Sequence, residues 1–274
     1  MPFPYKTVLI TGATSGIGLA LAERMISAGI FVIAIGRRKD RLEALVEKHG
    51  SEKVAVEPFD VSDLDAMPAW VEQITSKYPR LDSIILNAGF QRSLDFTSPC
   101  TISLSSVSAE LTTNYLSPLH MVSLFLPHLI SLAPSPTSIV LVSSGLAVLP
   151  LPRCANYSAT KAAVHSLAWS LRCQLSGPES PHTHHIKVIE IMPPAVQTEL
   201  HPQQKDLVEA GQDQPGIELE RYIEETWVDL VVGEEEKEEI VHSVLRERLE
   251  AVEGPRKGAW EGFVRAMRGA GLRF

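Results

Sequence analysis

The chain has 274 residues, of which 45% are hydrophobic, and it carries a net charge of −8. This length and apolar content favour one large α/β domain over two small ones, and the chain lacks the run of about 18 apolar residues that a membrane span needs. The N-terminus shows no secretory signal and three scattered cysteines show no disulfide framework, so we expect a cytoplasmic protein.

The negative charge is concentrated in residues 218–250, which hold 12 acidic and 4 basic side chains. Acidic residues at helical spacing usually form a solvated helix face. A phosphate backbone requires a basic surface, so this composition argues against nucleic acid as a partner. Three histidines, His182, His184 and His185, share no ligand spacing with a cysteine or carboxylate, so we predict no metal site.

Short apolar runs alternate along the chain with longer amphipathic stretches. Near-continuous apolarity is typical of strands that are covered on both faces. We predict strands at Lys6–Ile10, Phe31–Ile35, Val54–Phe59, Ser83–Leu86, Ser138–Val142 and Lys187–Ile191, with a weaker seventh at Glu239–His242. We predict helices at Leu19–Ala28, Asp40–His49, Leu64–Tyr78, Ser105–Ser131 and Tyr157–Leu175. This alternation predicts an α/β fold, a doubly wound parallel sheet of about seven strands flanked by helices.

A glycine-rich turn joins the first strand to the first helix. Residues 11–18 read TGATSGIG, so that Gly12, Gly16 and Gly18 precede an apolar-periodic helix. Backbone amides at a helix N-terminus can face a pyrophosphate, and missing side chains permit its close approach. The turn therefore predicts a dinucleotide site.

A possible proton-transfer group follows the fifth strand. Tyr157 and Lys161 stand one helical turn apart, so the ammonium can stabilise a phenolate whose ordinary pKa is near ~10 and can reach ribose hydroxyls. Ser144 ends the fifth strand, at the edge of the sheet where ligands bind, although Ser143 competes for its role. Tyr157 and Lys161 could be structural, and Asn114 could be a kink residue.

These motifs, with Asn87-Ala88-Gly89 after the fourth strand and Asn114 in a helix, resemble the short-chain dehydrogenase/reductase family over about residues 5–200. The resemblance implies a single NAD(P)-binding Rossmann-like domain, residues 1–274, with a variable substrate-side segment at about 195–230. It implies a catalytic set of Ser144, Tyr157, Lys161 and Asn114, in which Asn114 holds a water. The family's spacing between the serine and the tyrosine favours Ser144 over Ser143. The implied cofactor contacts are Gly12, Thr14, Ser15, Gly16, Ile17, Gly18, Arg37, Arg38, Asp60, Val61, Asn87, Ala88, Gly89, Tyr157, Lys161, Pro193, Val196 and Thr198.

One position departs from the family pattern. Pro193-Pro194 stands where the family usually has Pro-Gly, next to the expected place of the nicotinamide carboxamide. The second proline stiffens this backbone. Val196 and Thr198 keep their expected spacing, so we expect cofactor binding to survive.

The end of the second strand bears on the choice of cofactor. Gly36-Arg37-Arg38 follows it, and no acidic residue occurs before Asp40. An acid at this place accepts from a free ribose hydroxyl, whereas arginine accommodates a 2′-phosphate. We predict NADP(H) rather than NAD(H); the alternative is that both arginines simply begin a solvated helix.

The sequence thus predicts an NADP(H)-dependent oxidoreductase that interconverts a carbonyl and an alcohol. A non-redox isomerase or dehydratase and an NADP(H)-binding pseudoenzyme remain alternatives. Leu146–Leu151 and the segment after Thr198 should line the pocket for a small hydrophobic substrate, with His201–Gly216 as a mobile lid. We expect a homodimer or homotetramer through the helices at Ser105–Ser131 and Tyr157–Leu175, unless the acidic C-terminal region covers them.

Overall fold

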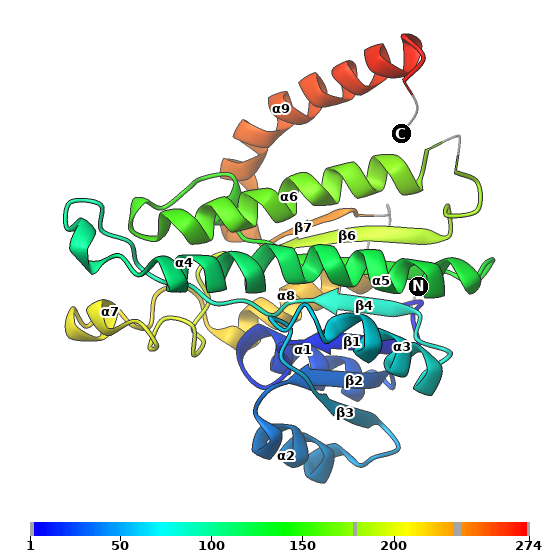
Figure 1. Cartoon of the computed structure of the whole chain (residues 1–274), viewed down its shortest axis with the longest axis horizontal. Coiled ribbons are helices and arrows are strands. Elements are labelled where there is room, and N and C mark those ends of the chain that lie inside the picture. Colours follow the sequence, from blue (N-terminus) through cyan, green and yellow to red (C-terminus); the bar gives the residue numbers. More distant parts are fainter. Residues whose placement is uncertain (1–2, 178–179, 233–236, 273–274) are drawn as a thin grey trace.

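Seven parallel strands form one sheet in the order β3-β2-β1-β4-β5-β6-β7 (Figure 1). The computed structural model describes residues 3–177, 180–232 and 237–272. The strands are β1 (Thr7–Thr11), β2 (Phe31–Gly36), β3 (Val54–Pro58), β4 (Ser83–Leu86), β5 (Thr137–Val142), β6 (Ile186–Met192) and β7 (Glu239–Val241). Every predicted strand is present, and no end differs from its prediction by more than one residue.

Helices cover both faces of the sheet and connect its strands. They are α1 (Gly16–Ser27), α2 (Lys39–His49), α3 (Met67–Lys77), α4 (Leu104–Leu111), α5 (Ser117–Ser131), α6 (Ala155–Leu175), α7 (Lys205–Glu209), α8 (Leu219–Val232) and α9 (Ser243–Gly269). Among the described residues, no helix is long and apolar enough to cross a membrane. The doubly wound parallel sheet predicted from the sequence is confirmed.

The prediction of a single helix at Ser105–Ser131 is wrong, because this range holds two helices separated by a π turn. A π turn, Thr112–Leu116, separates α4 from α5 and contains the buried Asn114. Pro118 has no N–H to donate to the carbonyl of Asn114 four residues earlier, so a regular α-helix cannot continue through this point. The wider turn re-aims Asn114 at the place where a functional side chain is expected.

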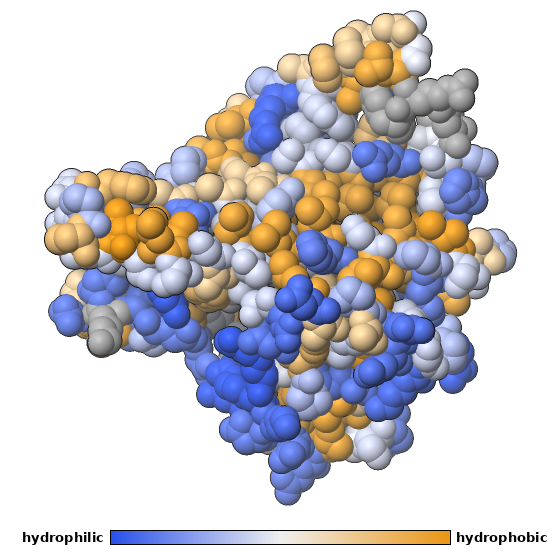
Figure 2. All heavy atoms as spheres, in the orientation of Figure 1, coloured by the Kyte–Doolittle hydropathy of each residue, from blue (hydrophilic) through white to orange (hydrophobic). Residues whose placement is uncertain are grey.

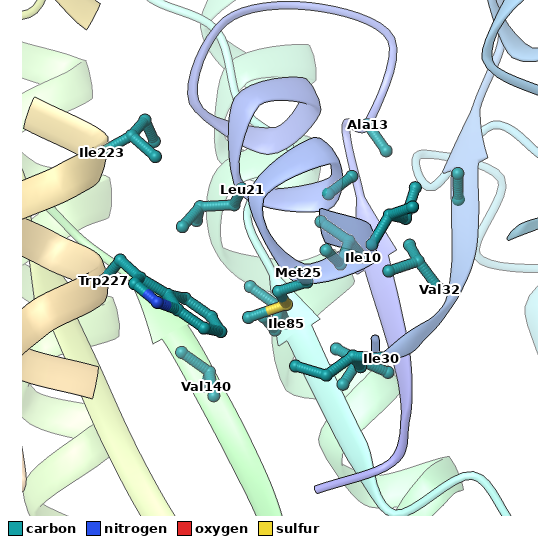
Figure 3. Close-up of a cluster of buried hydrophobic side chains, with 14 of the residues drawn as sticks. Ile10, Ala13, Leu21, Met25, Ile30, Val32, Ile85, Val140, Ile223 and Trp227 are labelled. Carbon is teal, nitrogen blue, oxygen red and sulfur yellow. The ribbon is translucent and has the colours of Figure 1, made fainter. Parts of the chain in front are cut away.

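The core has two apolar layers, one on each face of the sheet. Residues of α1, α2 and α8 pack on one face; Figure 3 shows Leu21 and Met25 of α1 opposite Ile223 and Trp227 of α8, with Val140 of β5 nearby. Residues of α3, α5 and α6 pack on the other face. Successive residues of β5 pack alternately into the two layers. Both faces of the strand are therefore buried, and its sequence is apolar without an alternation of apolar and polar residues.

The C-terminal helix α9 lies on the outer side of α6 (Figure 1). Its Trp260 contacts Trp169 of α6, with ring centroids 5.2 Å apart, and its Arg268 donates to the carbonyl of Cys173 at 3.1 Å. Helix α9 thus covers part of the α6 surface, including Trp169, which is buried.

Apolar side chains gather over α5 and α6 on the face seen in Figure 2. Among the apolar residues of the π turn, α5 and α6, Met121, Val164, Trp169 and Leu171 are buried, and Leu116, Leu119, Leu124 and Leu167 are half-buried.

The polar segment His201–Gly216, predicted as a mobile connection without regular structure, contains the helix α7. The segment is anchored at its far end, where Ile217 donates to Ala195 O at 3.0 Å and accepts from Gln197 N at 2.9 Å. Gly216 has φ +92°, and a Cβ there would lie 1.9 Å from Ala195 O, so this close approach requires glycine. These contacts fix the segment beside the carboxyl end of β6.

Candidate active site

The glycine-rich turn lies where the strand order reverses, between β1 and β4. Gly12 and Gly16 adopt positive φ angles of 71° and 54°, and Ser15 precedes the first residue of α1. A Cβ on Gly18 would lie 2.4 Å from Asn87 Nδ2 and 2.5 Å from Gly12 O. Bare backbone at a helix N-terminus, at the switch point of a parallel sheet, fits a dinucleotide pyrophosphate.

Thr11 joins this turn to the Asn87-Ala88-Gly89 motif. Its hydroxyl accepts from the backbone N–H groups of Asn87 and Ala88, both at 3.0 Å, and the Asn87 side chain donates to Thr11 O at 3.0 Å. The ends of β1 and β4 are thereby locked together. Thr11 is the first residue of the motif, but the sequence analysis did not include it among the site residues.

The two predicted arginines take different partners. Arg38 donates to Thr14 Oγ1 at 3.0 and 2.9 Å and to Ser15 Oγ at 2.6 Å, so its guanidinium lies over the glycine-rich turn. Arg37 is exposed and forms an ion pair with Asp60 at 3.4 Å. Burial raises the pKa of Asp60, but hydrogen bonds from Ser62 and the nearby Arg37 outweigh burial and lower it overall.

Glu199 is a site residue that the sequence analysis missed. It accepts from Arg38 at 2.8 Å and from Arg41 at 2.5 Å, so one carboxylate pairs with two of the cations around the turn. Burial raises the pKa of Glu199, but its hydrogen bonds with Arg38 and Arg41 lower it overall. No residue pattern identified it, because the pairing depends on how the segment after β6 folds back.

Ser144 and Tyr157 meet at the carboxyl end of β5. Both are buried, the Ser144 side chain interacts with the phenol, and the Ser144 hydroxyl accepts from Leu146 N at 3.1 Å. Burial raises the pKa of Tyr157 well above its ordinary value, and the Ser144 side chain offsets only part of this. The phenol is therefore protonated at neutral pH and can donate.

Lys161 lies one turn beyond Tyr157 on the same face of α6. Its Nζ is 5.6 Å from the centroid of the Tyr157 ring and donates to Val142 O at 2.8 Å. Burial lowers the pKa of Lys161 to about 8, although Glu190 and Glu110 act in the opposite direction. The ammonium thus titrates close to neutral pH.

Asn114 and Lys161 approach each other beside Gly89. A Cβ on Gly89 would lie 3.1 Å from Asn114 Oδ1 and 3.5 Å from Lys161 Nζ. Asn114 accepts from Phe90 N at 3.0 Å and donates to Phe90 O at 2.9 Å and Thr160 Oγ1 at 3.2 Å. Asn114 therefore lies in the π turn that interrupts its helix, and its side chain also lies near Lys161.

Ser143, the competitor for the serine role, points elsewhere. Its hydroxyl donates to the buried carboxylate of Glu190 at 2.5 Å. Ser143 lines the same cavity as Ser144, but Ser144 is the serine whose side chain lowers the pKa of Tyr157.

A cavity of about 1160 Å³ contains the predicted catalytic and cofactor residues except Gly18, which lies behind the turn, and Asn114. Leu146, Leu149 and Leu151 line it, as predicted, as do residues between Glu199 and Pro215. Pro193, Pro194, Val196 and Thr198 also line it. The predicted residues Asp60 and Val61 form part of the same wall.

Polar residues also line the cavity near its leucines, and the sequence analysis did not anticipate them. Arg153 forms an ion pair with Asp206 of α7, and Arg248 comes from α9. His201 is buried, and burial lowers its pKa, as does the nearby charge of Arg153. Helix α9 reaches the cavity because Leu245 lies against Gly145, beside Ser144.

A family profile described as short chain dehydrogenase matches residues 6–207. An uncharacterized oxidoreductase of Bacillus subtilis, DltE, is 33% identical over 97% of this chain and 98% of its own length. A short-chain dehydrogenase of Sphingobium yanoikuyae, solved with NADPH, is 26% identical with a TM-score of 0.76, covering 93% of this chain and 95% of its own.

A short-chain dehydrogenase/reductase of Burkholderia phymatum, solved with NAD, has a TM-score of 0.76 at 19% identity. It covers 91% of this chain and 93% of its own, and it supports the fold alone. The chain belongs to the short-chain dehydrogenase family, and it is an oxidoreductase of the type whose solved structures hold NAD or NADP.

Proposed function

We propose that this protein is an NADP(H)-dependent oxidoreductase that interconverts a carbonyl and an alcohol on a small hydrophobic substrate. The observation that carries the proposal is the meeting of Ser144, Tyr157 and Lys161 on the wall of one cavity that also holds the glycine-rich turn. A phenol that can give up a proton, a second hydroxyl that can donate a hydrogen bond to the carbonyl oxygen, and a nearby cation together suit proton transfer to that oxygen.

In this proposal Tyr157 is the acid that protonates the substrate oxygen. Its raised pKa keeps the proton on the phenol until the substrate oxygen gains charge. Ser144 donates to the same oxygen and orients it. Lys161 stabilises the phenolate that remains, and Asn114 positions a water beside Lys161. A bound nicotinamide supplies the hydride for the carbonyl carbon.

The preference for NADP(H) is supported by the cations around the glycine-rich turn. Arg38 hydrogen bonds to the side chains of Thr14 and Ser15, and the exposed Arg37 stands beside it. Both guanidinium groups suit a 2′-phosphate, and β2 ends without an acid that would accept from a ribose hydroxyl. A solved relative that is 26% identical is in complex with NADPH, which supports this preference.

A non-redox enzyme and a pseudoenzyme are the two alternatives that the experiment below distinguishes from this proposal. A non-redox isomerase or dehydratase would retain the cofactor site without net turnover of NADPH. A pseudoenzyme would bind NADPH and need no Ser144, Tyr157 and Lys161 together on the cavity wall, so their presence there favours an enzyme.

The substrate class is inferred from the leucines of the cavity wall, Leu146, Leu149, Leu151, Leu207 and Leu245. An apolar body would contact these side chains, and burying it stabilises the complex by about 25 cal/mol per Å². We further propose a variable substrate-side segment at 195–230, a homodimer or homotetramer and a cytoplasmic location; these stay predictions.

The test measures NADPH and NADH consumption with a panel of aldehydes and ketones. We expect turnover with NADPH. Turnover with neither cofactor would reject the redox proposal, and net isomerisation or dehydration would support the first alternative.

The choice of cofactor is tested with Arg38→Gln and the matched control Lys39→Gln, which removes an exposed charge one residue away. A charge-assisted hydrogen bond contributes about 1.5–3 kcal/mol, so Arg38→Gln should weaken NADPH binding about ten- to hundredfold and leave NADH unchanged. Lys39→Gln should change neither. Equal affinities of the wild-type protein for NADPH and NADH would contradict the assignment.

A further inference from the structure

The leucine-lined end of the cavity differs in charge from the end that holds the glycine-rich turn. Two of the described residues that line the cavity are acidic, Asp60 and Glu199, and both pair with arginines around the turn. The wall beside the leucines contains two arginines, Arg153 and Arg248, and no carboxylate from the described part of the chain. This end of the cavity therefore has an excess of positive charge.

Arg153 is held by a carboxylate that lies outside the cavity wall. It donates to Asp206 Oδ2 of α7, from Nε at 2.9 Å and from Nη2 at 2.5 Å. The neighbouring His201 adds no charge, because burial and Arg153 lower its pKa. The His201 Nδ1 is buried and has no hydrogen-bond partner among the described residues. The charge of Arg153 is thus offset locally, whereas a polar atom of His201 is unused.

Arg248 of α9 has no such partner. Within residues 3–177, 180–232 and 237–272, its side chain makes no ion pair and no hydrogen bond. Arg246, on the same helix, is paired with Asp229 at 3.2 Å and does not line the cavity. Ligand pockets are mostly apolar and contain a few polar groups that orient the ligand, and a guanidinium presents a planar fork that matches a carboxylate. Arg248 therefore provides an unoccupied anion contact on a largely apolar wall.

The start of α9 places Arg248 close to the proposed reaction site. Leu245 precedes Arg248 by one helical turn, so the two side chains share a face of α9, and both line the cavity. A Cβ on Gly145 would lie 2.5 Å from Leu245 Cδ1, and Gly145 follows Ser144. Leu245 thus packs beside the catalytic serine, and Arg248 extends the same wall.

A buried ion pair fixes the next turns of α9 to the core. The His165 ring of α6 lies between two carboxylates, with Nε2 2.9 Å from Glu253 Oε2 of α9 and Nδ1 2.9 Å from both oxygens of Glu190. Burial lowers the pKa of His165, but hydrogen bonds and charge interactions with both carboxylates raise it overall. The helix that carries Arg248 is therefore held in place before a ligand binds, which reduces the entropic cost of binding.

We propose that Arg248 is a specificity-determining residue that binds a carboxylate of the substrate. The substrate then combines a carbonyl, an apolar body and an acidic end. This assignment rests on the proposed function, which places the carbonyl at Tyr157. The leucines contact the apolar body, and the guanidinium donates to the carboxylate oxygens in a charge-assisted hydrogen bond.

The experiment compares aldehydes that carry a terminal carboxylate with their methyl esters, over a series of chain lengths and with NADPH. Esterification removes the charge and leaves the aldehyde and the apolar body in place. The ratio of kcat/KM for the acid to kcat/KM for the ester therefore isolates the effect of the charge. We expect the wild-type protein to favour the acid by about tenfold or more at the best chain length, chiefly through a lower KM.

Arg248→Gln should lower this ratio by about tenfold, and Arg248→Lys, which keeps the charge but loses the fork, should retain part of it. Arg246→Gln is the matched control, because it removes a cation from the same helix at a place outside the cavity wall. It should leave the ratio unchanged. Arg153→Gln should lower the ratio less than Arg248→Gln, because Asp206 already offsets the charge of Arg153.

Calorimetry makes the same comparison without turnover, with straight-chain alkanoates and their primary amides added to the protein in the presence of NADPH. We expect the alkanoates to bind more tightly than the amides, and Arg248→Gln to remove the difference. This result in a protein that reduces no aldehyde would reject the proposed function and still support the anion site. Equal binding of alkanoate and amide, or reduction of acid and ester with equal kcat/KM at every chain length, would overturn the assignment and leave the proposed function intact. A loss of NADPH affinity in Arg248→Gln would also overturn it, because Arg248 would then contact the cofactor.

Discussion

At the residue scale, Glu199 competes with any phosphate for the cations of the glycine-rich turn. Its carboxylate accepts from both Arg38 and Arg41. All three side chains are partly exposed, so each ion pair contributes only about 0.2–1 kcal/mol. The competition is therefore weak but measurable.

We predict that Glu199→Gln tightens NADPH binding by about two- to fivefold, because Arg38 and Arg41 are then released to the 2′-phosphate. Binding of NADH should change less. Fluorescence titration of both cofactors measures the effect. Weaker NADPH binding in this variant would mean that Glu199 holds the arginines in place and does not compete with the cofactor.

Site residues that belong to a local motif could be predicted from the sequence. Site residues that are defined by a contact with a residue distant in the sequence could not. Gly12, Tyr157 and Lys161 lie where their motifs predict. Glu199 and Arg38 are separated by 161 residues, and their contact depends on how the segment after β6 folds. Local sequence carries no signal for such a contact, and the same holds for His165 and Glu253, which are 88 residues apart.

At the element scale, the contact between α6 and α9 depends on the charge of His165. Its pKa in the folded protein lies above the ordinary value of 6.5, because Glu190 and Glu253 outweigh the effect of burial. A raised folded pKa stabilises the folded state fully below about pH 6.5, and this stabilisation is lost as pH rises through the folded pKa.

We therefore predict that the free energy of unfolding decreases more steeply with rising pH in the wild-type protein than in His165→Gln. The difference should appear above about pH 6.5. Urea denaturation over a series of pH values measures it. His182→Gln, which removes an exposed loop histidine, should retain the wild-type slope. A wild-type slope in His165→Gln would show that the ring is neutral in the folded protein.

The elements themselves were largely predictable, because strands covered on both faces need continuous apolar runs. The exceptions include the C-terminal helix α9, which was not predicted, and the helix that divides at the π turn Thr112–Leu116. Pro118 in the sequence signals an interruption, but helix periodicity alone does not reveal whether a proline kinks, ends or widens a helix. The helix α7 was missed because five residues are too few to show a period.

At the scale of the whole molecule, the surface near α4 and α5 keeps exposed apolar side chains (Figure 2). Leu104 and Leu111 of α4 are 75% and 40% exposed. The outer surface of α6 differs, because α9 covers Trp169. Exposed apolar patches mark interaction surfaces, so this surface is where we expect the predicted oligomer to form.

We predict a homodimer or homotetramer by light scattering at micromolar concentration. Leu111→Glu should shift the mass towards the monomer, because a charge buried at an interface is costly. Val208→Glu, at a residue of α7 that is 49% exposed, is the control and should leave the mass unchanged. A monomeric wild-type protein would rule out this assembly.

The most direct test of the proposed function is the turnover number for carbonyl reduction by Tyr157→Phe. The change removes the phenol hydroxyl and keeps the ring that packs beside Lys161. General acid catalysis contributes about 10²–10⁴ in rate, so kcat should fall by at least about a hundredfold, with NADPH affinity unchanged. Near-native kcat in Tyr157→Phe would contradict the mechanism and would favour a non-redox role for this site.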